Sequence, residues 1–145
     1  MNVEWYNGIS ECGNIIAPIF EDLESSVQSH LEDDGDNCDY GIVFNNDKPC
    51  GVIKVFERKD DELGIDEELP FISEMGTTRK VKGAGDALFK AFVKEYGDVF
   101  WLKCLDEKAE SFWKHEAEKH GIECENIGET AWGTSILLFG VELEK

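Results

Sequence analysis

The distribution of apolar residues predicts a strand, a turn and a long helix at the start of the chain. Residues 3–6 are typical of a short strand, and Asn7-Gly8 is typical of a turn. From Asn14 onward the apolar residues recur every three or four positions, which predicts a helix that tolerates Pro18 near its start. The apolar stripe of this helix would be Ile15, Ile16, Ile19, Phe20, Leu23, Val27 and Leu31.

The middle of the chain has the pattern of a β-hairpin followed by a third strand. Two short runs rich in β-branched and aromatic residues are separated by turn-forming residues, so we expect a hairpin. Two acidic segments are expected to be exposed loops. The predicted strands are 39–44, 51–56 and 69–77, the last entered through Pro70; the hairpin turn is 45–49, and the acidic loops are 32–36 and 57–68.

The second half alternates helices and strands. A helix carrying Ala87, Leu88, Ala91, Phe92 and Tyr96 on one face should end at Gly97. The nearly continuous apolar run 99–105 is typical of a strand buried on both faces beside a parallel neighbour. Asp106 can cap a further helix that should stop at Gly121. The inner face of that helix would be Ala109, Phe112, Trp113 and Ala117, and two last strands would be 122–127 and 135–143.

This order of elements predicts one domain, residues 1–145, of the α+β class. Its three-layer α/β arrangement would be a mixed, mostly antiparallel β-sheet flanked by helices. One strand-helix-strand crossover, from 69–77 to 99–105, should be parallel. A chain of 145 residues is long enough to bury a sizeable core.

A basic loop with two glycines joins the predicted strand 69–77 to the helix after it. Arg79, Lys80 and Lys82 precede Gly83 and Gly85, in the one cluster of three basic residues within four positions. Glycine lets a ligand approach the backbone closely, and the first amides of a helix have no internal partner. Such a loop is suited to phosphate. An ordinary strand-to-helix turn with a solvated basic rim is the alternative.

The net charge is −18, and it is concentrated in the first half of the chain. Residues 1–78 carry −15 and residues 79–145 carry −3. This balance disfavours nucleic acid as a partner, because phosphate contacts need a basic face. It favours a cationic substrate or partner, with simple solubility as the alternative. No apolar run reaches the roughly 20 residues that span a bilayer, so we expect no membrane contact.

The cysteines and histidines do not form a recognisable metal or disulfide pattern. The five Cys are odd in number and form no C-x-x-C pair, so we expect reduced thiols. His115 and His120 lie five positions apart, which is wrong for chelation by an i, i+4 pair, and no metal site is expected. The N-terminus lacks the basic and apolar regions of a signal peptide, and a cytoplasmic protein is expected.

On two motifs the chain resembles the GNAT (Gcn5-related N-acetyltransferase) superfamily, over nearly all of its length. The family's loop signature is Gln/Arg-x-x-Gly-x-Gly/Ala, and residues 80–85 are Lys-Val-Lys-Gly-Ala-Gly, followed by Ala87-Leu88. The second signature, Asn-x-x-Ala-x-x-x-Tyr before a Gly-Phe pair, corresponds to Asp106, Ala109 and Trp113, with Gly121-Ile122 after them. The hairpin 39–56 corresponds to the family's second and third strands.

The resemblance implies an acetyltransferase that uses acetyl-CoA as cosubstrate and a cationic amine, a small molecule or a protein Lys side chain, as acceptor. The backbones of 74–77 and 102–105 would line the cosubstrate, and a homodimer is an open alternative to a monomer. The implied cosubstrate contacts are Met75, Thr77, Lys80, Val81, Lys82, Gly83, Ala84, Gly85, Ala87, Asp106, Ala109 and Trp113. For the general base, Glu74 is the first candidate and Glu68, with Glu67, the second; a solvated carboxylate is the alternative for each.

The chain departs from the family at several positions of these motifs. Lys80 replaces Gln or Arg, Asp106 replaces Asn, and the carboxylate of Asp86 is unfavourable beside a pyrophosphate. Trp113 stands where many members have a tyrosine that protonates the leaving thiolate, and an indole N–H cannot serve as that acid. Trp113 keeps open the alternative of a catalytically weak or inactive GNAT-like protein that binds acyl-CoA, or nothing, and serves as a sensor or partner-binding module. The net charge of −18 keeps open the alternative of an unrelated acidic interaction protein.

Overall fold

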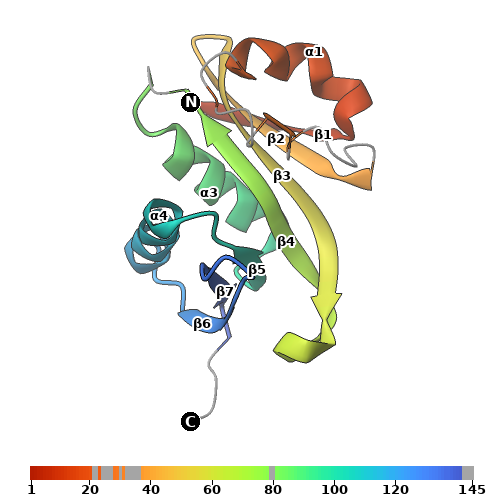
Figure 1. Ribbon diagram of the computed structural model, residues 1–145. Helices are drawn as coiled ribbons and strands as arrows, with labels where there is room; N and C mark the ends of the chain where they lie inside the picture. Colours follow the sequence, from red (N-terminus) through yellow and green to blue (C-terminus); the bar gives the residue numbers. More distant parts are fainter. Residues whose placement is uncertain (21–22, 24–27, 30, 32–36, 79–80, 142–145) are drawn as a thin grey trace. The chain divides into compact units, whose positions relative to one another are not determined.

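The computed structural model describes residues 1–20, 23, 28–29, 31, 37–78 and 81–141 (Figure 1). The predicted acidic loop 32–36 and Val27 of the predicted apolar stripe lie outside them. The described elements are β1 (Asn2–Asn7), α1 (Ile9–Phe20), β2 (Asp39–Asn45), β3 (Lys48–Asp60), the 3-10 turn η2 (Asp61–Leu63), β4 (Ile65–Thr77), α3 (Ala84–Tyr96), β5 (Phe100–Lys103), α4 (Glu107–Lys119), β6 (Cys124–Glu129) and β7 (Ser135–Phe139).

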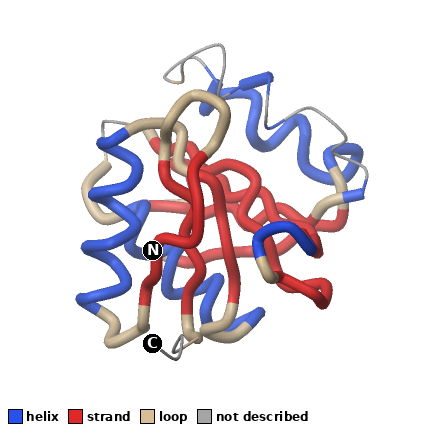
Figure 2. The backbone as a smooth tube through the Cα atoms, turned by 60° about the horizontal axis from the view of Figure 1, so that its bottom comes forward, coloured by secondary structure: helices blue, strands red, loops and turns tan. Residues whose placement is uncertain are grey.

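The seven strands form one mixed sheet in the order β1-β2-β3-β4-β5-β7-β6, drawn red in Figure 2. β1 pairs with β2, β2 with β3, β5 with β7 and β7 with β6, all antiparallel. β4 and β5 pair in parallel, with Phe71 opposite Trp101 and Ile72 opposite Leu102. The predicted α+β class, the mostly antiparallel sheet and the single parallel crossover are confirmed.

The first helix begins earlier than predicted. α1 starts at Ile9 rather than Asn14, so Pro18 lies inside its last turns and not near its start. The N-terminal end is fixed by the Glu11 carboxylate, whose Oε1 accepts the backbone N–H of Asn7 at 3.4 Å. Cys12, Ile16 and Ile19 then share one fully buried face, so the apolar stripe begins one turn before the run of isoleucines.

The β2–β3 hairpin has a tighter turn than expected. Residues 45–49 were predicted to form the turn, but only Asn46 and Asp47 do so, with φ of 52° and 64°. Two consecutive left-handed residues make the two-residue turn whose twist matches that of paired strands. Pro49 consequently lies inside β3, where it is opposite Phe44.

The predicted acidic loop 57–68 is wrong. β3 continues to Asp60 and β4 begins at Ile65, with η2 and Gly64 (φ 82°) between them. The Asp60 carboxylate accepts the N–H groups of Glu62 and Leu63, which closes the turn. The charged side chains of β3 do not prevent a strand, because Glu57 and Lys59 alternate outward and are exposed. Pro70, expected at the start of its strand, lies inside β4.

The two later helices end where the sequence predicts. Gly97 (φ 93°) follows α3 and Gly121 (φ 69°) follows the end of α4. On α3, Leu88 and Phe92 are buried as predicted, together with Ala84 and Phe89; Ala87, Ala91 and Tyr96 are only half-buried. On α4, Trp113 and Ala117 are buried and Ala109 and Phe112 half-buried. β6 has the predicted length but lies two residues later than predicted, and β7 ends at Phe139 rather than at residue 143.

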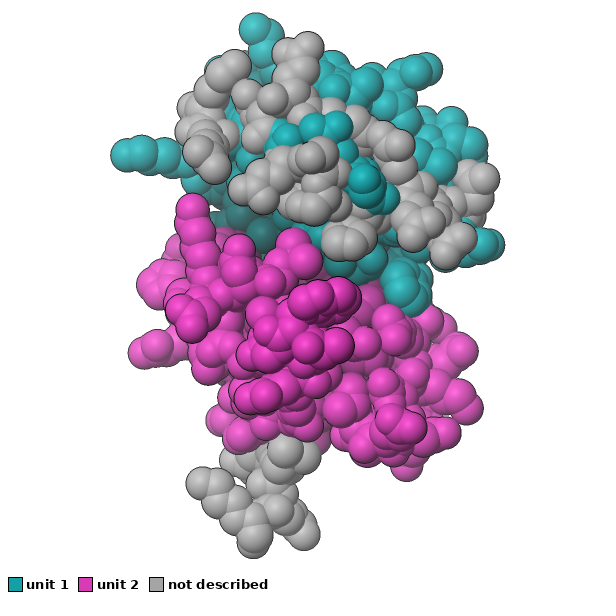
Figure 3. All heavy atoms as spheres, viewed as in Figure 1, with its two compact units in different colours: residues 1–56, 73–95 teal, residues 57–72, 96–145 magenta. Residues whose placement is uncertain are grey.

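The chain divides into two compact units, which Figure 3 distinguishes by colour. Unit 1 consists of Met1–Phe56 and Ser73–Glu95, and unit 2 of Glu57–Ile72 and Tyr96–Lys145. In unit 1, α1 packs on β1 and β2 around a core that includes Ile16, Tyr40 and Ile42. That the whole chain is a single domain stays a prediction. Within the described residues, no helix has the length and apolar character needed to cross a membrane.

Candidate functional site

The glycine loop places exposed backbone directly before α3 in unit 1. Val81 is half-buried, and Lys82 and Gly83 are exposed. Gly83 has a φ of 87°, which favours glycine, and a Cβ there would meet only the Met1 Cε atom, at 3.5 Å. The backbone at Gly83 is therefore open to a ligand. The predicted contact Lys80, with Arg79, lies outside the described residues.

The first turn of α3 follows the loop without a break. The N–H of Ala87 donates to the Gly83 carbonyl at 3.0 Å. The N–H groups of residues 84–86 therefore come before this hydrogen bond of the first helical turn. Ala84 is buried at 1% exposure, which anchors the turn. Asp86, the residue that sequence reasoning found unfavourable, pairs with Lys90 at 3.4 Å, and this ion pair offsets its charge.

A hollow of about 580 Å³ lies between β1 and α3. Its apolar walls come from Val3 and Trp5 on β1 and from Ala87 on α3, one of the predicted cosubstrate contacts. Sequence reasoning did not find this hollow, because β1 and α3 are distant in the chain. The complete lining is Met1, Val3, Trp5, Asp86, Ala87, Lys90, Ala91, Lys94 and Glu95.

The last residues of β4 hold the first candidate base. Glu74 is buried at 7% exposure, and its Oε1 accepts the backbone N–H of Met75 at 3.2 Å. Met75 and Thr77 are half-buried. Glu68 and Glu67, the second candidates, are exposed near the start of the strand, at least six residues before Glu74. The structure therefore separates the candidates: Glu74 is enclosed, and the other two are solvated.

The parallel pairing that β4 makes with β5 is short. It covers Phe71 and Ile72 on β4, within unit 2, and β5 ends at Lys103. β4 itself continues for five residues beyond Ile72, to Thr77. Just after β5, the N–H of Cys104 donates a hydrogen bond to the Ser135 carbonyl of β7, at 2.9 Å. Of the backbone predicted to line the cosubstrate, residues 74–77 and 103–105 follow this short parallel ladder, whereas Leu102 belongs to it.

The second motif forms the start of α4 in unit 2. Asp106 is the N-cap, and its carboxylate accepts the N–H of Ala109 at 2.7 Å. This bond is the one that the family's asparagine could also make, so the replacement preserves the cap. Trp113 is buried at 6% exposure, and its ring meets that of Phe112 edge-on at 5.1 Å. Its contact with a cosubstrate stays a prediction.

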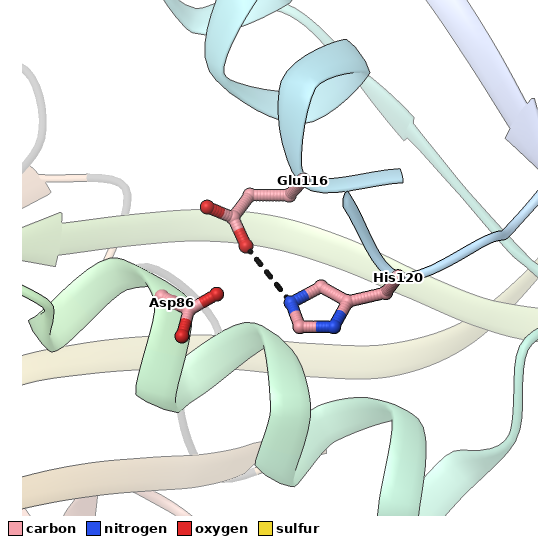
Figure 4. Close-up of side chains that lie close together, drawn as sticks. All are labelled: Asp86, Glu116 and His120. Carbon is pink, nitrogen blue, oxygen red and sulfur yellow. Dashed lines mark ion pairs between the residues drawn. The ribbon is translucent and has the colours of Figure 1, made fainter. Parts of the chain in front are cut away.

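A buried acid on α4 was missed by the sequence analysis. Glu116 is 4% exposed, and its Oε2 lies 3.3 Å from Nε2 of His120, one helical turn further on (Figure 4). The spacing i, i+4 was available from the sequence, but helical spacing alone does not show which face of α4 is buried. The pair closes the C-terminal end of the helix, where His120 is also the C-cap residue.

Comparisons with known proteins place this arrangement among known folds. No protein-family model matches the chain. No curated protein matches its sequence. Many solved structures match its fold.

Three of these structures show how far the likeness extends. A GNAT-family acetyltransferase from Bacillus cereus matches with a TM-score of 0.64 and 16% identity, covering 99% of this chain and 100% of its own. The Corynebacterium glutamicum protein described as histone acetyltransferase HPA2 and related acetyltransferase matches at 0.65 and 11%, covering 100% and 99%. Diaminobutyrate acetyltransferase from Paenibacillus lautus, solved with L-2,4-diaminobutyric acid and coenzyme A, matches at 0.54 and 13%, covering 96% and 95%. The chain therefore has the GNAT fold, as its two motifs predicted.

Proposed function

We propose that this protein transfers the acetyl group of acetyl-CoA to a primary amine. The proposal rests on one observation: β4, the open glycine loop and α3 follow one another within a GNAT fold. Several proteins of this fold are described as N-acetyltransferases, and a diaminobutyrate acetyltransferase of this fold was solved with coenzyme A. The fold removes the alternative of an acidic protein of unrelated architecture.

The loop suits the pyrophosphate of the cosubstrate. The backbone at Gly83 is open, and the amides at the start of α3 lie at the positive end of the helix dipole. Lys82 is exposed and adds a cation. Phosphate binding at this point would be weakened by Asp86, but the ion pair with Lys90 offsets that charge. These residues therefore fit an anionic group, and Ala87 would contact the same part of the cosubstrate.

Glu74 would carry the proton transfer. An amine is protonated at neutral pH and attacks only after losing a proton, which the buried Glu74 carboxylate accepts, directly or through one water molecule. The amine nitrogen then forms a bond to the acetyl carbonyl carbon. The carbon–sulfur bond breaks, and coenzyme A leaves as its thiolate. The product is an amide, and no redox change takes place.

The acceptor is proposed to be cationic, either a small molecule or a Lys side chain. The net charge of −18 attracts such a group over long range. A structural neighbour acts on diaminobutyrate, which is itself an amine. Because the described cysteines form no disulfides, we also propose a cytoplasmic location. Size-exclusion chromatography distinguishes a monomer from the alternative of a homodimer.

A second candidate function is an acyl-CoA-binding module without turnover. It is favoured by Trp113, which is buried and offers no acid where many family members have tyrosine. In the enzyme, the thiolate would leave unassisted or take a proton from water. Turnover of any amine separates the two candidates, whereas binding of acetyl-CoA is common to both.

A thermal-shift titration tests the binding step. We expect acetyl-CoA at a hundredfold excess over its Kd to stabilise the protein by about 2.7 kcal/mol. The double variant Gly83→Asp and Gly85→Asp should lose this shift. Gly97→Asp is a matched control, since Gly97 is also exposed, has a φ of 93° and has no atom within 4 Å of an added Cβ. An equal shift in the loop variant and the control would show that the loop does not bind acetyl-CoA.

A further inference from the structure

Two opposite charges are buried in the sheet of unit 1. Lys54 on β3 is 3% exposed and Glu74 on β4 is 7% exposed. They are the buried charged side chains among the described residues of unit 1, and neither lacks a partner. A lysine is almost never fully buried unless it is paired. The sequence carries a signal for this site, because Lys54 is a lone charge inside the apolar run 52–55.

The register between β3 and β4 is fixed near the end of β4. The two strands are neighbours in the sheet. The N–H of Thr78 donates to the Cys50 carbonyl at 2.9 Å. A Cβ added to Gly51 would lie 3.0 Å from Cγ2 of Thr77. The hydrogen bond puts Cys50 opposite Thr78, and the contact puts the next residue, Gly51, opposite Thr77.

Three steps along each strand from this point bring Lys54 opposite Glu74. Directly opposite residues of antiparallel strands point to the same face, with Cβ atoms about 4.5–5.5 Å apart. That separation lets the ammonium group of a lysine reach a carboxylate on the next strand. The Glu74 carboxylate accepts the Met75 N–H at Oε1, and its second oxygen, Oε2, is also a hydrogen-bond acceptor.

The other ionisable groups on this face are neutral or engaged elsewhere. Tyr40 lies opposite Lys54 on β2, and Tyr6 lies opposite Tyr40 on β1. The Tyr6 hydroxyl donates to Glu4 at 2.9 Å, and the Tyr40 hydroxyl donates to a backbone carbonyl. On α1, Cys12 faces the same cluster, and its thiol lies 3.5 Å from a backbone carbonyl. Among the described groups of unit 1, Lys54 is therefore the cation of this face.

We propose that Lys54 is a positioning residue that holds Glu74 in its carboxylate form, ready to take the proton of the acceptor amine. The inference rests on the proposed function, in which Glu74 is the general base. Burial alone favours the neutral acid, which cannot accept a proton, whereas an adjacent cation favours the carboxylate. Lys54 acts through Glu74 and does not itself contact the substrate.

A double-variant cycle tests whether the pair exists, and it needs no substrate. The variants are Lys54→Met, Glu74→Gln and both together, with Lys48→Met as the control because Lys48 is exposed on the same strand. The measurement is the urea midpoint of unfolding at neutral pH. We expect each single change to lower the midpoint and the double variant to lose less than the two losses combined. Strictly additive losses would overturn the inference.

The pH dependence of turnover tests the catalytic role. Release of the coenzyme A thiol would be followed with acetyl-CoA and a panel of diamines and lysine peptides. In Lys54→Met we expect kcat/KM to fall about tenfold or more at pH 7 and to recover toward higher pH, where Glu74 ionises without help. Lys54→Arg should restore the original profile, and the KM for acetyl-CoA should stay within a few-fold of that of the unaltered protein.

The outcomes separate this inference from the function on which it rests. An unaltered pH profile in an active Lys54→Met variant would overturn the positioning role and leave the acetyltransferase intact. A protein that neither binds acetyl-CoA nor acetylates any amine would overturn the proposed function and the catalytic role together. In that case the urea cycle still decides whether Lys54 and Glu74 form a pair.

Discussion

The indole N–H of Trp101 donates to the backbone carbonyl of Arg58 at 3.0 Å, joining β5 to the far end of β3. The Arg58 guanidinium in turn lies 5.0 Å from the ring centre of Phe71 and 5.4 Å from that of Trp101. The two rings pack at 4.5 Å. A residue expected in an acidic loop is thus half-buried, and its guanidinium group lies over two aromatic rings of unit 2.

The first prediction concerns this hydrogen bond. Trp101→Phe keeps an aromatic ring but leaves the Arg58 carbonyl without its indole donor in a buried place. We expect a loss of about 1–3 kcal/mol in the free energy of unfolding, measured in urea. Trp132→Phe is the control, because Trp132 is 88% exposed, and it should change stability by less than about 0.5 kcal/mol. Equal losses in both variants would contradict the role of Trp101.

The second prediction concerns Trp113, whose indole N–H cannot serve as a general acid. Trp113 is buried on α4, and Trp113→Tyr should preserve the fold because it keeps an aromatic ring at this position. If departure of the thiolate limits the natural rate, the new hydroxyl should raise kcat by up to about 10²-fold on any accepted amine. Binding of acetyl-CoA should stay within a few-fold. An unchanged rate together with unchanged binding would mean that position 113 is remote from the thioester sulfur.

The third prediction concerns the thiols. Burial, with a smaller contribution from Glu110, raises the pKa of Cys104 to about 12, and burial raises the pKa of Cys12 and of Cys124 to about 11. Their ordinary value is 9.0, so above pH 9 the unfolded chain ionises while the folded chain keeps its protons. Stability should therefore be fully present below about pH 9 and decline as the pH rises toward 11.

Thiol titration gives the matching measurement. At pH 8 the folded protein should react slowly with a disulfide reagent, because the thiolate is the reactive form and Cys12, Cys38, Cys50 and Cys104 are buried. Unfolding without a reductant should expose five reactive thiols per chain, since none of the five cysteines is disulfide-bonded. A count of three or one would show that disulfides form in the protein as isolated.

The fourth prediction concerns the end of α4. His120→Ala removes the ion partner of Glu116, whose carboxylate is buried. We expect a loss of about 1–3 kcal/mol in the free energy of unfolding, measured in urea, because the buried Glu116 carboxylate loses this neighbour. His115→Ala is the control on the same helix, because His115 is exposed. An equal loss in His115→Ala would contradict the role of the contact between Glu116 and His120.

Some elements could be predicted from the sequence because their ends carry a local chemical signal. Asp106 and Gly121 mark the two ends of α4, and the structure agrees with both. The apolar run around Trp101 indicates a strand buried on both faces, since both faces need apolar residues. In these places local propensity and tertiary packing favour the same structure.

Other features depend on residues that are distant in the chain. The strand character of residues 57–60 follows from the packing of Arg58 on two rings, which no local pattern reveals. The same holds for the site. The glycine loop is a local motif, whereas the proposed pairing of Lys54 with Glu74 depends on a register between strands that only the structure supplies. The hollow between β1 and α3 is hidden from the sequence for the same reason.

The division of the chain into two units has a consequence for its synthesis. Each unit is built from two segments separated in sequence: unit 1 needs Ser73–Glu95 and unit 2 needs Tyr96–Lys145. As the chain leaves the ribosome, unit 1 is complete once Glu95 has emerged, whereas Glu57–Ile72 must wait for β5 and β7. During that interval the strand edge formed by β4 has no neighbour, and unpaired edges promote aggregation. The acidic residues of Glu57–Ile72 would protect the nascent chain by charge repulsion until β5 is made.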